Sequence, residues 1–549
     1  MLKSQSFVNK LLIFGSFLMV TGQYGFAQDS TKRKTIEITS TFKPVLREAV
    51  KINFNAAPPA VDSSRPTLNY QIPSQNLLFN YQPASLKPVA LQGDSVTAWK
   101  YSNYIKAGVG NVIIPYLKAG FSFGDGENTF YNVFAKHMSA KGSLPFQKNS
   151  ETGVEATGTR KIANNLELNG SLGFDSDDYF FYGFQPSTLD FSKSELRQRF
   201  QTFEGKASLR TTKPTSFGLN FYPNLKTSVF SGKNQFRKAT EANTVLNLPL
   251  QKSLGKSFGF NLGMTADLTT YRPSGKNSIQ NNLYFVSPAL LVTTPNLFIQ
   301  GGILPSWDNG EFNLLPNLLA DITTNDKRFT LQLGWIGYYN KGSYQRFASI
   351  NPWILQPDEL KNTKVQERYA GFKGSVLNHF TYSAKVGFAQ YSNMPLFVND
   401  SLDGKTFLTV YSSSMEALQL HGEIGYTQGE TFSATAKLTW NQYSKVRNHA
   451  RAWGLLPFEF NAAFNWQVMK DVWLKSDLFA WDGAAYRTKN KEPRKGDTGF
   501  DLNAGLEFKI TKQFNFWVQL NNILNNRYER WHQYQVYGFN LVGGVVYSF

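Results

Sequence analysis

The residues whose types and spacing could support catalysis form two short glycine–serine motifs. Gly120–Gly124 (GFSFG) and Gly255–Gly259 (GKSFG) both match the Gly-x-Ser-x-Gly pattern of a serine nucleophile. That pattern works where a strand turns sharply into a helix, because the turn exposes the serine hydroxyl above the sheet. Neither motif is followed by a segment with helical periodicity. We therefore predict no catalytic serine and no enzymatic activity.

Metal chemistry is the second possibility. The chain has no cysteine, which excludes disulfides, a lipoprotein anchor and thiolate metal sites. Asp175, Asp177 and Asp178 lie close together in sequence and could offer oxygen ligands to calcium, but a complete calcium loop is missing. A solvated acidic loop is the competing interpretation, and we favour it. The histidines lack the spacing of zinc ligands, so we predict no metal and no cofactor. They are His137, His379, His421, His449 and His532.

Basic residues are the third candidate group, within a chain whose formal net charge is +18. Three hydrophilic stretches concentrate them and could attract anionic ligands, with general solubilising charge as the alternative. The stretches contain Lys233, Arg237 and Lys238; Lys445, Arg447 and Arg451; and Lys489, Lys491, Arg494 and Lys495.

The first 27 residues have the order of a secretory signal peptide. Lys3 and Lys10 precede an apolar run, Leu11–Val20, and a small-residue site at Gly25–Ala27 follows. The apolar run is too short to span a bilayer, and we expect cleavage after Ala27. An exported chain meets lipid and lipopolysaccharide phosphates or anionic solutes, so we expect those as partners of the basic stretches and exclude nucleic acid.

The elements that position these residues are strands. From Trp99 onward apolar and polar residues alternate with a period of two, as in Phe329–Trp335 and Phe500–Ile510. No later stretch is apolar enough for a membrane-spanning helix. Composition agrees, because aromatic residues are 15% of the chain and suit half-buried strands.

The connections between strands indicate how the sheet is built. Ten short turns alternate, with few exceptions, with longer connections, the pattern of an outer-membrane barrel with short periplasmic turns and longer outer loops. Ten turns separate eleven hairpins, so we predict an all-β, antiparallel transmembrane barrel of about 22 strands over residues 99–549, with 16 to 20 strands as alternatives. The turns begin at Gly124, Ile162, Thr211, Ser253, Thr293, Thr324, Val376, Gln428, Met469 and Thr511.

Two segments need a separate interpretation. Residues 28–98 carry seven of the 23 prolines, so we expect an extended periplasmic or lumen-threading segment there. The aromatic run beside the acidic residues is expected in the outer aromatic girdle of the barrel, with a partner-binding surface as the alternative. That run is Tyr179, Phe180, Phe181, Tyr182 and Phe184.

The last 36 residues resemble the closing hairpin of TonB-dependent receptors. In that family a strand runs into an Asn-Leu-Phe-Asn-x-x-Tyr type motif, followed by an outer loop and a last strand with a terminal aromatic residue. The resemblance implies the outer membrane of a Gram-negative bacterium, assembly by the barrel assembly machinery and a role in solute transport. The matching residues are Asn522, Ile523, Leu524, Asn525, Tyr528 and Phe549.

The chain departs from that family ahead of the barrel. The receptors have a plug of well over a hundred residues, whereas only about 70 precede the first predicted strand here. The chain is most similar to short, plugless receptor-like barrels of Bacteroidota. Lys34–Pro44 resembles the energy-coupling box that precedes such a plug, but we favour the competing interpretation, a β-prone stretch in a disordered tail. TonB dependence is therefore left open.

The predicted closing strand runs from Tyr537 to Phe549. Every second residue is apolar, and aromatic residues stand at both ends, as expected for a lipid-facing side. In outer-membrane proteins such a strand is also read by the insertion machinery, so we predict that it closes the barrel and acts as its assembly signal. The residues of this face are Tyr537, Phe539, Leu541, Gly543, Val545, Tyr547 and Phe549.

Two functions follow from this sequence. The first is solute transport across the outer membrane by a receptor-like barrel. The alternative is a plugless structural subunit of an envelope or surface-protein assembly, held by other envelope proteins. In both cases a barrel of this size must be blocked to avoid leakage, by inward-folded loops, by residues 29–95 or by a second protein.

Overall fold

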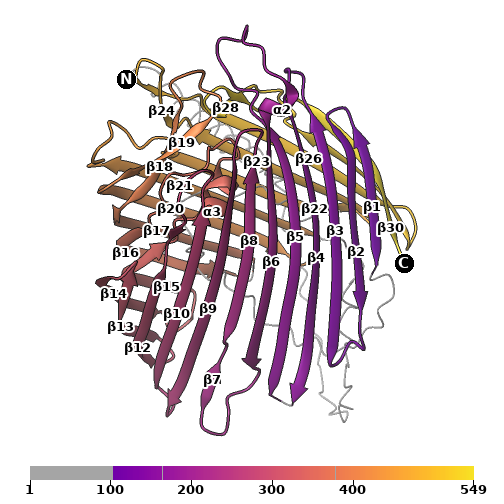
Figure 1. Ribbon diagram of the computed structural model, residues 1–549. Coiled ribbons are helices and arrows are strands. Elements are labelled where there is room, and N and C mark those ends of the chain that lie inside the picture. Colours follow the sequence, from indigo (N-terminus) through magenta and orange to yellow (C-terminus); the bar gives the residue numbers. More distant parts are fainter. Residues whose placement is uncertain (1–102, 164, 378) are drawn as a thin grey trace, which may run out of the picture. The chain divides into compact units, whose positions relative to one another are not determined.

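The protein forms a closed antiparallel β-barrel of 22 strands. The computed structural model describes residues 103–549 apart from 164 and 378, so the predicted signal peptide and proline-rich segment lie outside the described residues. Figure 1 shows the strands side by side around the wall. The wall strands are β1 Tyr104–Gly110, β2 Ile113–Phe123, β3 Thr129–Lys141, β4 Lys148–Ala163, β5 Leu166–Phe180, β6 Arg197–Thr211, β8 Asn224–Lys233, β9 Lys238–Leu254, β10 Phe258–Arg272, β12 Leu283–Thr293, β13 Leu297–Asp308, β14 Glu311–Thr323, β15 Phe329–Asn340, β16 Thr363–Val376, β17 Phe380–Ser392, β20 Met415–Gln428, β21 Phe432–Ser444, β22 Phe458–Met469, β23 Val472–Asp482, β26 Gly499–Lys509, β27 Phe514–Asn521 and β30 Asn540–Ser548.

Short elements decorate the connections. The two helices are brief, and no helix in residues 103–549 as described is long and apolar enough to cross a membrane. The helices are α2 Lys193–Leu196 and α3 Tyr344–Ile350. The short strands are β7 Leu219–Phe221, β11 Ile279–Gln280, β18 Met394–Asn399, β19 Phe407–Ser412, β24 Ala485–Arg487, β25 Pro493–Lys495, β28 Glu529–Trp531 and β29 Tyr534–Gln535.

The strands form where the sequence alternates. In β15 the side chains of Phe329, Leu331, Leu333 and Trp335 are 36–42% exposed, on the side that would face lipid. Polar residues between them face the lumen, because successive side chains of a strand point to opposite faces. A barrel can therefore be apolar outside and polar inside.

The barrel closes between its first and last strands. Strand β1 pairs with β30 from Tyr104↔Ser548 to Gly110↔Val542, and β30 pairs on its other edge with β27. Glycine permits a close approach here, since a Cβ on Gly108 would lie 2.5 Å from Cζ2 of Trp517. The closure predicted for the last strand is confirmed, and β1 and β30 are neighbours in Figure 1.

The connections confirm the predicted strand number and exclude the alternatives of 16 to 20. All ten predicted turns join consecutive strands at one end of the barrel. The expectation of long connections at the other end is wrong in places. The basic stretch around Arg237 is a short turn, Asn234–Arg237, because Lys233 and Lys238 already pair in the sheet. Strands β13 and β14 are joined only by Asn309 and Gly310.

Candidate functional site

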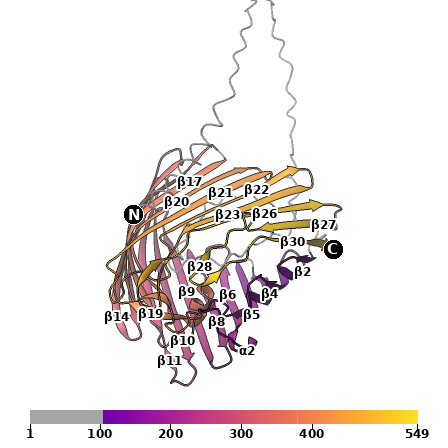
Figure 2. The same ribbon diagram turned by 90° about the horizontal axis from the view of Figure 1, so that it is seen from above.

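The long connections fold into the outer end of the lumen and pack together as a cap. Four of them supply most of its apolar core: residues 341–362 with α3, 393–414 with β18 and β19, 445–457, and 522–539 with β28 and β29. Figure 2 shows β28 within the ring of strands. The core includes Tyr344, Phe347, Ile354, Leu396, Phe397, Phe407, Trp453, Trp531 and Tyr534, each no more than 3% exposed.

A carboxylate on the barrel wall anchors the cap at α3. Glu241, on β9, is 1% exposed and accepts hydrogen bonds from Ser343 Oγ at 2.8 Å and from the Tyr344 amide at 2.6 Å. The Gln345 amide donates to the same carboxylate. These donors belong to the first turn of the helix, whose amides lack partners within the helix. The wall therefore caps a helix that belongs to a loop.

A buried amide network fixes the base of the same connection. Asn281 Nδ2 donates to the Gly342 carbonyl at 2.8 Å, and the Asn281 and Asn362 side chains bond each other. Asn362 Nδ2 also donates to Asp308 Oδ1 at 2.7 Å. Lys341 forms an ion pair with Asp267 of β10, at 3.2 Å. Breaking these contacts would leave buried polar groups unpaired, which is costly.

The aromatic run Tyr179–Phe184 belongs to the cap, and its placement in the outer girdle was wrong. Phe180 and Phe181 are 6% and 2% exposed and pack on Leu196. Tyr182 lies edge-on to Tyr534, with ring centroids 4.9 Å apart, and its hydroxyl donates to the Gln535 carbonyl. The inward-folded loops offer an apolar surface, and these rings pack on it instead of lying on the outer surface of the barrel.

The acidic residues next to that run do not form a loop, so that interpretation was also wrong. Asp175, Asp177 and Asp178 all lie in β5, where alternation sends Asp178 to the face opposite the other two. Asp178 pairs with Arg197 and Arg199 at 2.8 and 2.9 Å, and Asp175 pairs with Lys136. Among the described residues no group of three potential ligands could hold a metal ion.

Beneath the cap the lumen is polar and solvated. Glu204 on β6 pairs with Lys206 and Lys226, whose side chains are 50% and 41% exposed. A cavity of about 580 Å³ lies in this part of the wall, and small residues such as Gly263 and Ala289 make room for it. In the described chain Asn261 Oδ1 is buried there without a hydrogen-bond partner. Five carboxamides line the cavity: Asn220, Gln251, Asn261, Gln300 and Asn317.

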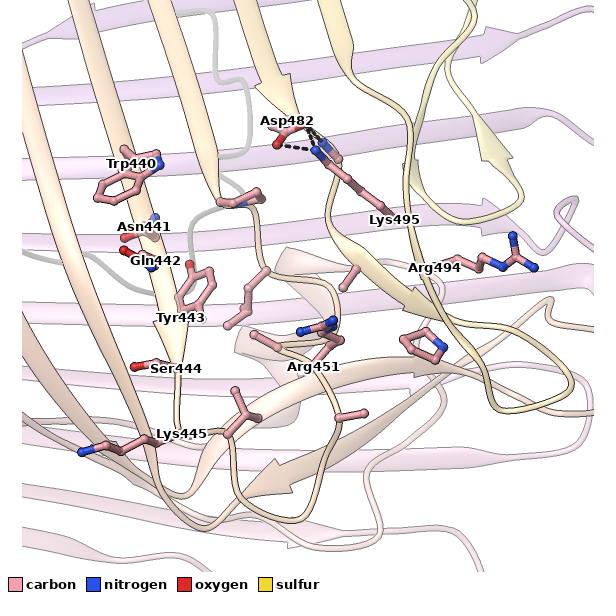
Figure 3. A pocket seen from close by; sticks show the side chains of 18 residues that line it. Trp440, Asn441, Gln442, Tyr443, Ser444, Lys445, Arg451, Asp482, Arg494 and Lys495 are labelled. Carbon is pink, nitrogen blue, oxygen red and sulfur yellow. Dashed lines mark hydrogen bonds and ion pairs between the residues drawn. The ribbon is translucent and has the colours of Figure 1, made fainter. Parts of the chain in front are cut away.

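The two later basic stretches meet at the outer rim. A cavity of about 830 Å³ is lined by Lys445, Arg451, Arg494 and Lys495, together with one acidic residue, Asp482. Lys495 Nζ lies 2.7 Å from Asp482 Oδ1. Figure 3 shows this pair, and it shows Arg451 between β21 and the β24–β25 hairpin, which carries Arg494. The remaining predicted basic residues do not line it. They are Arg447, Lys489 and Lys491.

The C-terminal motif forms the turn that ends β27. Asn522 has a positive φ of 48°, and its side chain donates to the Asn526 and Tyr537 carbonyls and accepts from the Asn526 amide. Asn525 Oδ1 accepts from the Phe539 amide, while the Tyr528 hydroxyl donates to Asp501 Oδ2 at 2.7 Å. Leu524 is exposed. The motif residues thus hold the last outer connection against β26 and β30.

The closing strand is shorter than predicted. It begins at Asn540, because the Tyr537 carbonyl is bound by the Asn522 side chain and the Tyr537 hydroxyl by Asn149. Phe539 precedes the strand and is exposed, while Tyr547 is half-buried. Leu541, Val545 and Phe549 are 41–48% exposed on the side that would face lipid.

Neither glycine–serine motif forms a nucleophile elbow. Gly120–Gly124 ends β2 and leads into the turn before β3, while Gly255–Gly259 spans the turn between β9 and β10. Both are followed by a strand, so the required strand-to-helix turn is not formed.

Comparison with known proteins shows which solved structures share this fold. No protein-family model and no curated protein matches the chain. Among solved structures, the FrpB iron transporter of Neisseria meningitidis matches with a TM-score of 0.63 at 10% identity, over 81% of each chain. A mutant of the ferric enterobactin receptor PfeA of Pseudomonas aeruginosa gives 0.61 at 12% identity, over 81% of this chain and 80% of PfeA.

FpvA of Pseudomonas aeruginosa, solved with an iron-loaded pyoverdine, gives a TM-score of 0.60 at 10% identity, over 81% of this chain and 71% of FpvA. At such identity the likeness concerns the fold alone. The closed 22-strand antiparallel barrel of this chain thus matches the barrels of TonB-dependent receptors in its fold.

Proposed function

We propose that this protein is an outer-membrane barrel of the TonB-dependent-receptor type that moves a solute through its lumen, with the loop cap as the gate. The observation that carries the proposal is the solvated lumen beneath the cap, with its carboxamide-lined cavity. Amide groups both donate and accept hydrogen bonds. They can therefore hold a polar solute without binding it as tightly as charged side chains would bind a solute of opposite charge. The fold neighbours, named as an iron transporter and as receptors for ferric ligands, support the same class of function.

This function would place the protein in the outer membrane of a Gram-negative bacterium, with lipopolysaccharide around its rim. The barrel assembly machinery would insert it. A plugless N-terminus and an origin in Bacteroidota are further parts of the proposal, whereas coupling to TonB through Lys34–Pro44 is left open.

Cross-linking tests whether the cap is a gate. Lys276 and Asp358 form a solvent-exposed ion pair, 2.7 Å apart, between the β10–β12 connection and the cap connection. The natural chain has no cysteine, so Lys276→Cys with Asp358→Cys can be linked selectively by a short, reducible bis-maleimide. Solute flux into proteoliposomes should fall to background on linking and return on reduction, while a single-cysteine variant should be unaffected.

A second function, a structural subunit of an envelope assembly, is favoured by the cap itself. Its apolar core and buried polar anchors resemble the interior of a folded domain more than a mobile loop. Excising Ser343–Leu360 distinguishes the transport function from the structural one. The remaining ends can be joined because they are adjacent: a Cβ on Gly342 would lie 2.0 Å from the Lys361 carbonyl oxygen. The structural role would be favoured by two results together. The excision variant would conduct ions, whereas the intact protein would show no flux whether the cross-link is formed or reduced.

A further inference from the structure

The wall of the barrel has a notch at its outer rim. Strands β21 and β22 pair only as far as Trp440↔Phe458, although β21 continues to Ser444. Pro457 precedes β22, and the chain before it folds inward to the cap through Ala452 and Leu455. The β24–β25 hairpin bounds the other side. The basic cavity of about 830 Å³ is this notch.

The notch begins where the lipid-facing side of β21 ends. Trp440 is 36% exposed, and Gln442 and Ser444, which follow at spacings of two, share its outward face and are exposed. Tryptophan marks the boundary between hydrocarbon and headgroups in membrane proteins. The basic side chains above Trp440 therefore stand at the level of the outer-leaflet headgroups.

Charge in the notch is only partly neutralised. Lys495 is paired with Asp482, and Lys445 with Glu416. Arg494 is 3.4 Å from Glu492, and both side chains are at least 60% exposed, so that pair is weak. In the described part of the chain Arg451 has no carboxylate within ion-pairing distance. Guanidinium groups bind phosphate through two parallel hydrogen bonds.

We propose that this notch binds the phosphate of a glycolipid headgroup in the outer leaflet, with Arg451 and Arg494 as its main ligands. Lys495 lines the same cavity, where it is paired with Asp482, and would contribute charge. The proposal rests on the proposed outer-membrane location, but it does not depend on whether the barrel transports a solute, because the site is in the rim and not in the lumen.

Matched variants test the site. Arg451→Gln with Arg494→Gln removes two charges from the notch, while Lys489→Gln with Lys491→Gln removes two from the same region outside it. Native mass spectrometry and affinity for nanodiscs containing a diphosphorylated lipid A should show a loss of about tenfold or more for the first variant and little change for the second. Arg451→Lys with Arg494→Lys keeps the charge but loses the two parallel hydrogen bonds, so its affinity should lie between those of the natural protein and the glutamine variant, which also reports that the rim is folded.

Three outcomes would overturn the proposal. Equal losses in the two glutamine variants would mean that general surface charge attracts the lipid. Equal affinity for dephosphorylated lipid A would exclude a phosphate site. Inorganic phosphate that binds as tightly as the lipid, and competes fully with it, would assign the notch to a free anion. Because binding is electrostatic, its affinity should fall as salt rises.

Discussion

The carboxylate of Glu241, in the barrel wall, accepts a hydrogen bond from the hydroxyl of Ser343, in the cap, across 2.8 Å. The two residues are 102 positions apart in the chain, and the contact is buried. It joins the wall of the barrel to the cap.

Replacing Glu241 by alanine should loosen α3 without unfolding the barrel. Three donors would lose their acceptor, at about 1–3 kcal/mol for each buried group left unpaired. Hydrogen exchange at Tyr344–Ile350 should accelerate, while amides of β9 keep their protection. Glu241→Gln keeps an acceptor and should show a smaller effect; equal effects of the two variants would contradict this role for the carboxylate.

A large side chain at position 108 should destabilise the closing seam. The Gly108 Cβ position is 2.5 Å from Trp517, which is 2% exposed, so Gly108→Leu overpacks the β1–β30 junction. Overpacking costs about 1–3 kcal/mol, and the temperature at which the barrel loses its folded gel mobility should fall. Gly301→Leu is the control, because a Cβ there meets nothing within 4 Å; a matching loss in the control would refute the seam explanation.

Replacing Asn522 by alanine should weaken the last outer connection. The change removes three side-chain hydrogen bonds and places alanine at a φ of 48°. We expect a loss of about 2–4 kcal/mol in local stability, measured by hydrogen exchange at the amides of Asn526 and Phe539. Leu524→Ala, at an exposed position of the same motif, should have little effect.

Acid should open the β18–β19 hairpin. Burial alone would raise the pKa of Asp400, but hydrogen bonds from Thr406, Leu402 and Asp403 outweigh it, and the pKa is held below its usual value. A depressed pKa stabilises the fold above the unfolded value of about 3.9, and this stabilisation is lost as the pH falls through the folded value. Exchange at these amides, corrected for intrinsic rates, should rise below about pH 4. Asp400→Asn should remove that pH dependence; an unchanged profile would disprove it.

A charge at position 549 should impair assembly. Phe549 is 41% exposed on the side that would face lipid, and its backbone pairs with Asn103 in both directions. Phe549→Asp should lower the fraction of folded protein in the outer membrane, measured by cell fractionation and heat-dependent gel mobility. Leu402→Asp, at an exposed position of the β18–β19 hairpin, should assemble normally. Normal insertion of Phe549→Asp would refute the assembly-signal role.

The wall could be predicted from sequence because its rules are local. Phe329–Trp335 alternates whatever lies next to it, and the ten short turns mark strand ends without knowledge of the partner strand. The strand number followed from counting these turns. The limits of β30 did not, because the Tyr537 carbonyl is bound by Asn522, fifteen residues away.

The cap could not be predicted, because its contacts are long-range. Tyr182 and Phe181 have the composition of a membrane girdle, and only the presence of Trp353 and Tyr534 beside them makes the cap the better environment. Glu241 carries no local sign of its role, since a single carboxylate among polar residues suits any strand that faces water. The basic stretches were recognised, but sequence alone could not tell that Arg451 and Arg494 share a cavity while Lys489 does not.

The composition of the cap has a consequence for the order of folding. Tyr344 and Trp531 share one core although eight of the 22 wall strands separate them in sequence. Contacts of such separation become favourable only after the intervening strands have been ordered. The cap should therefore form last, after the wall has closed, and an assembly intermediate should be an open ring that conducts ions before it seals itself.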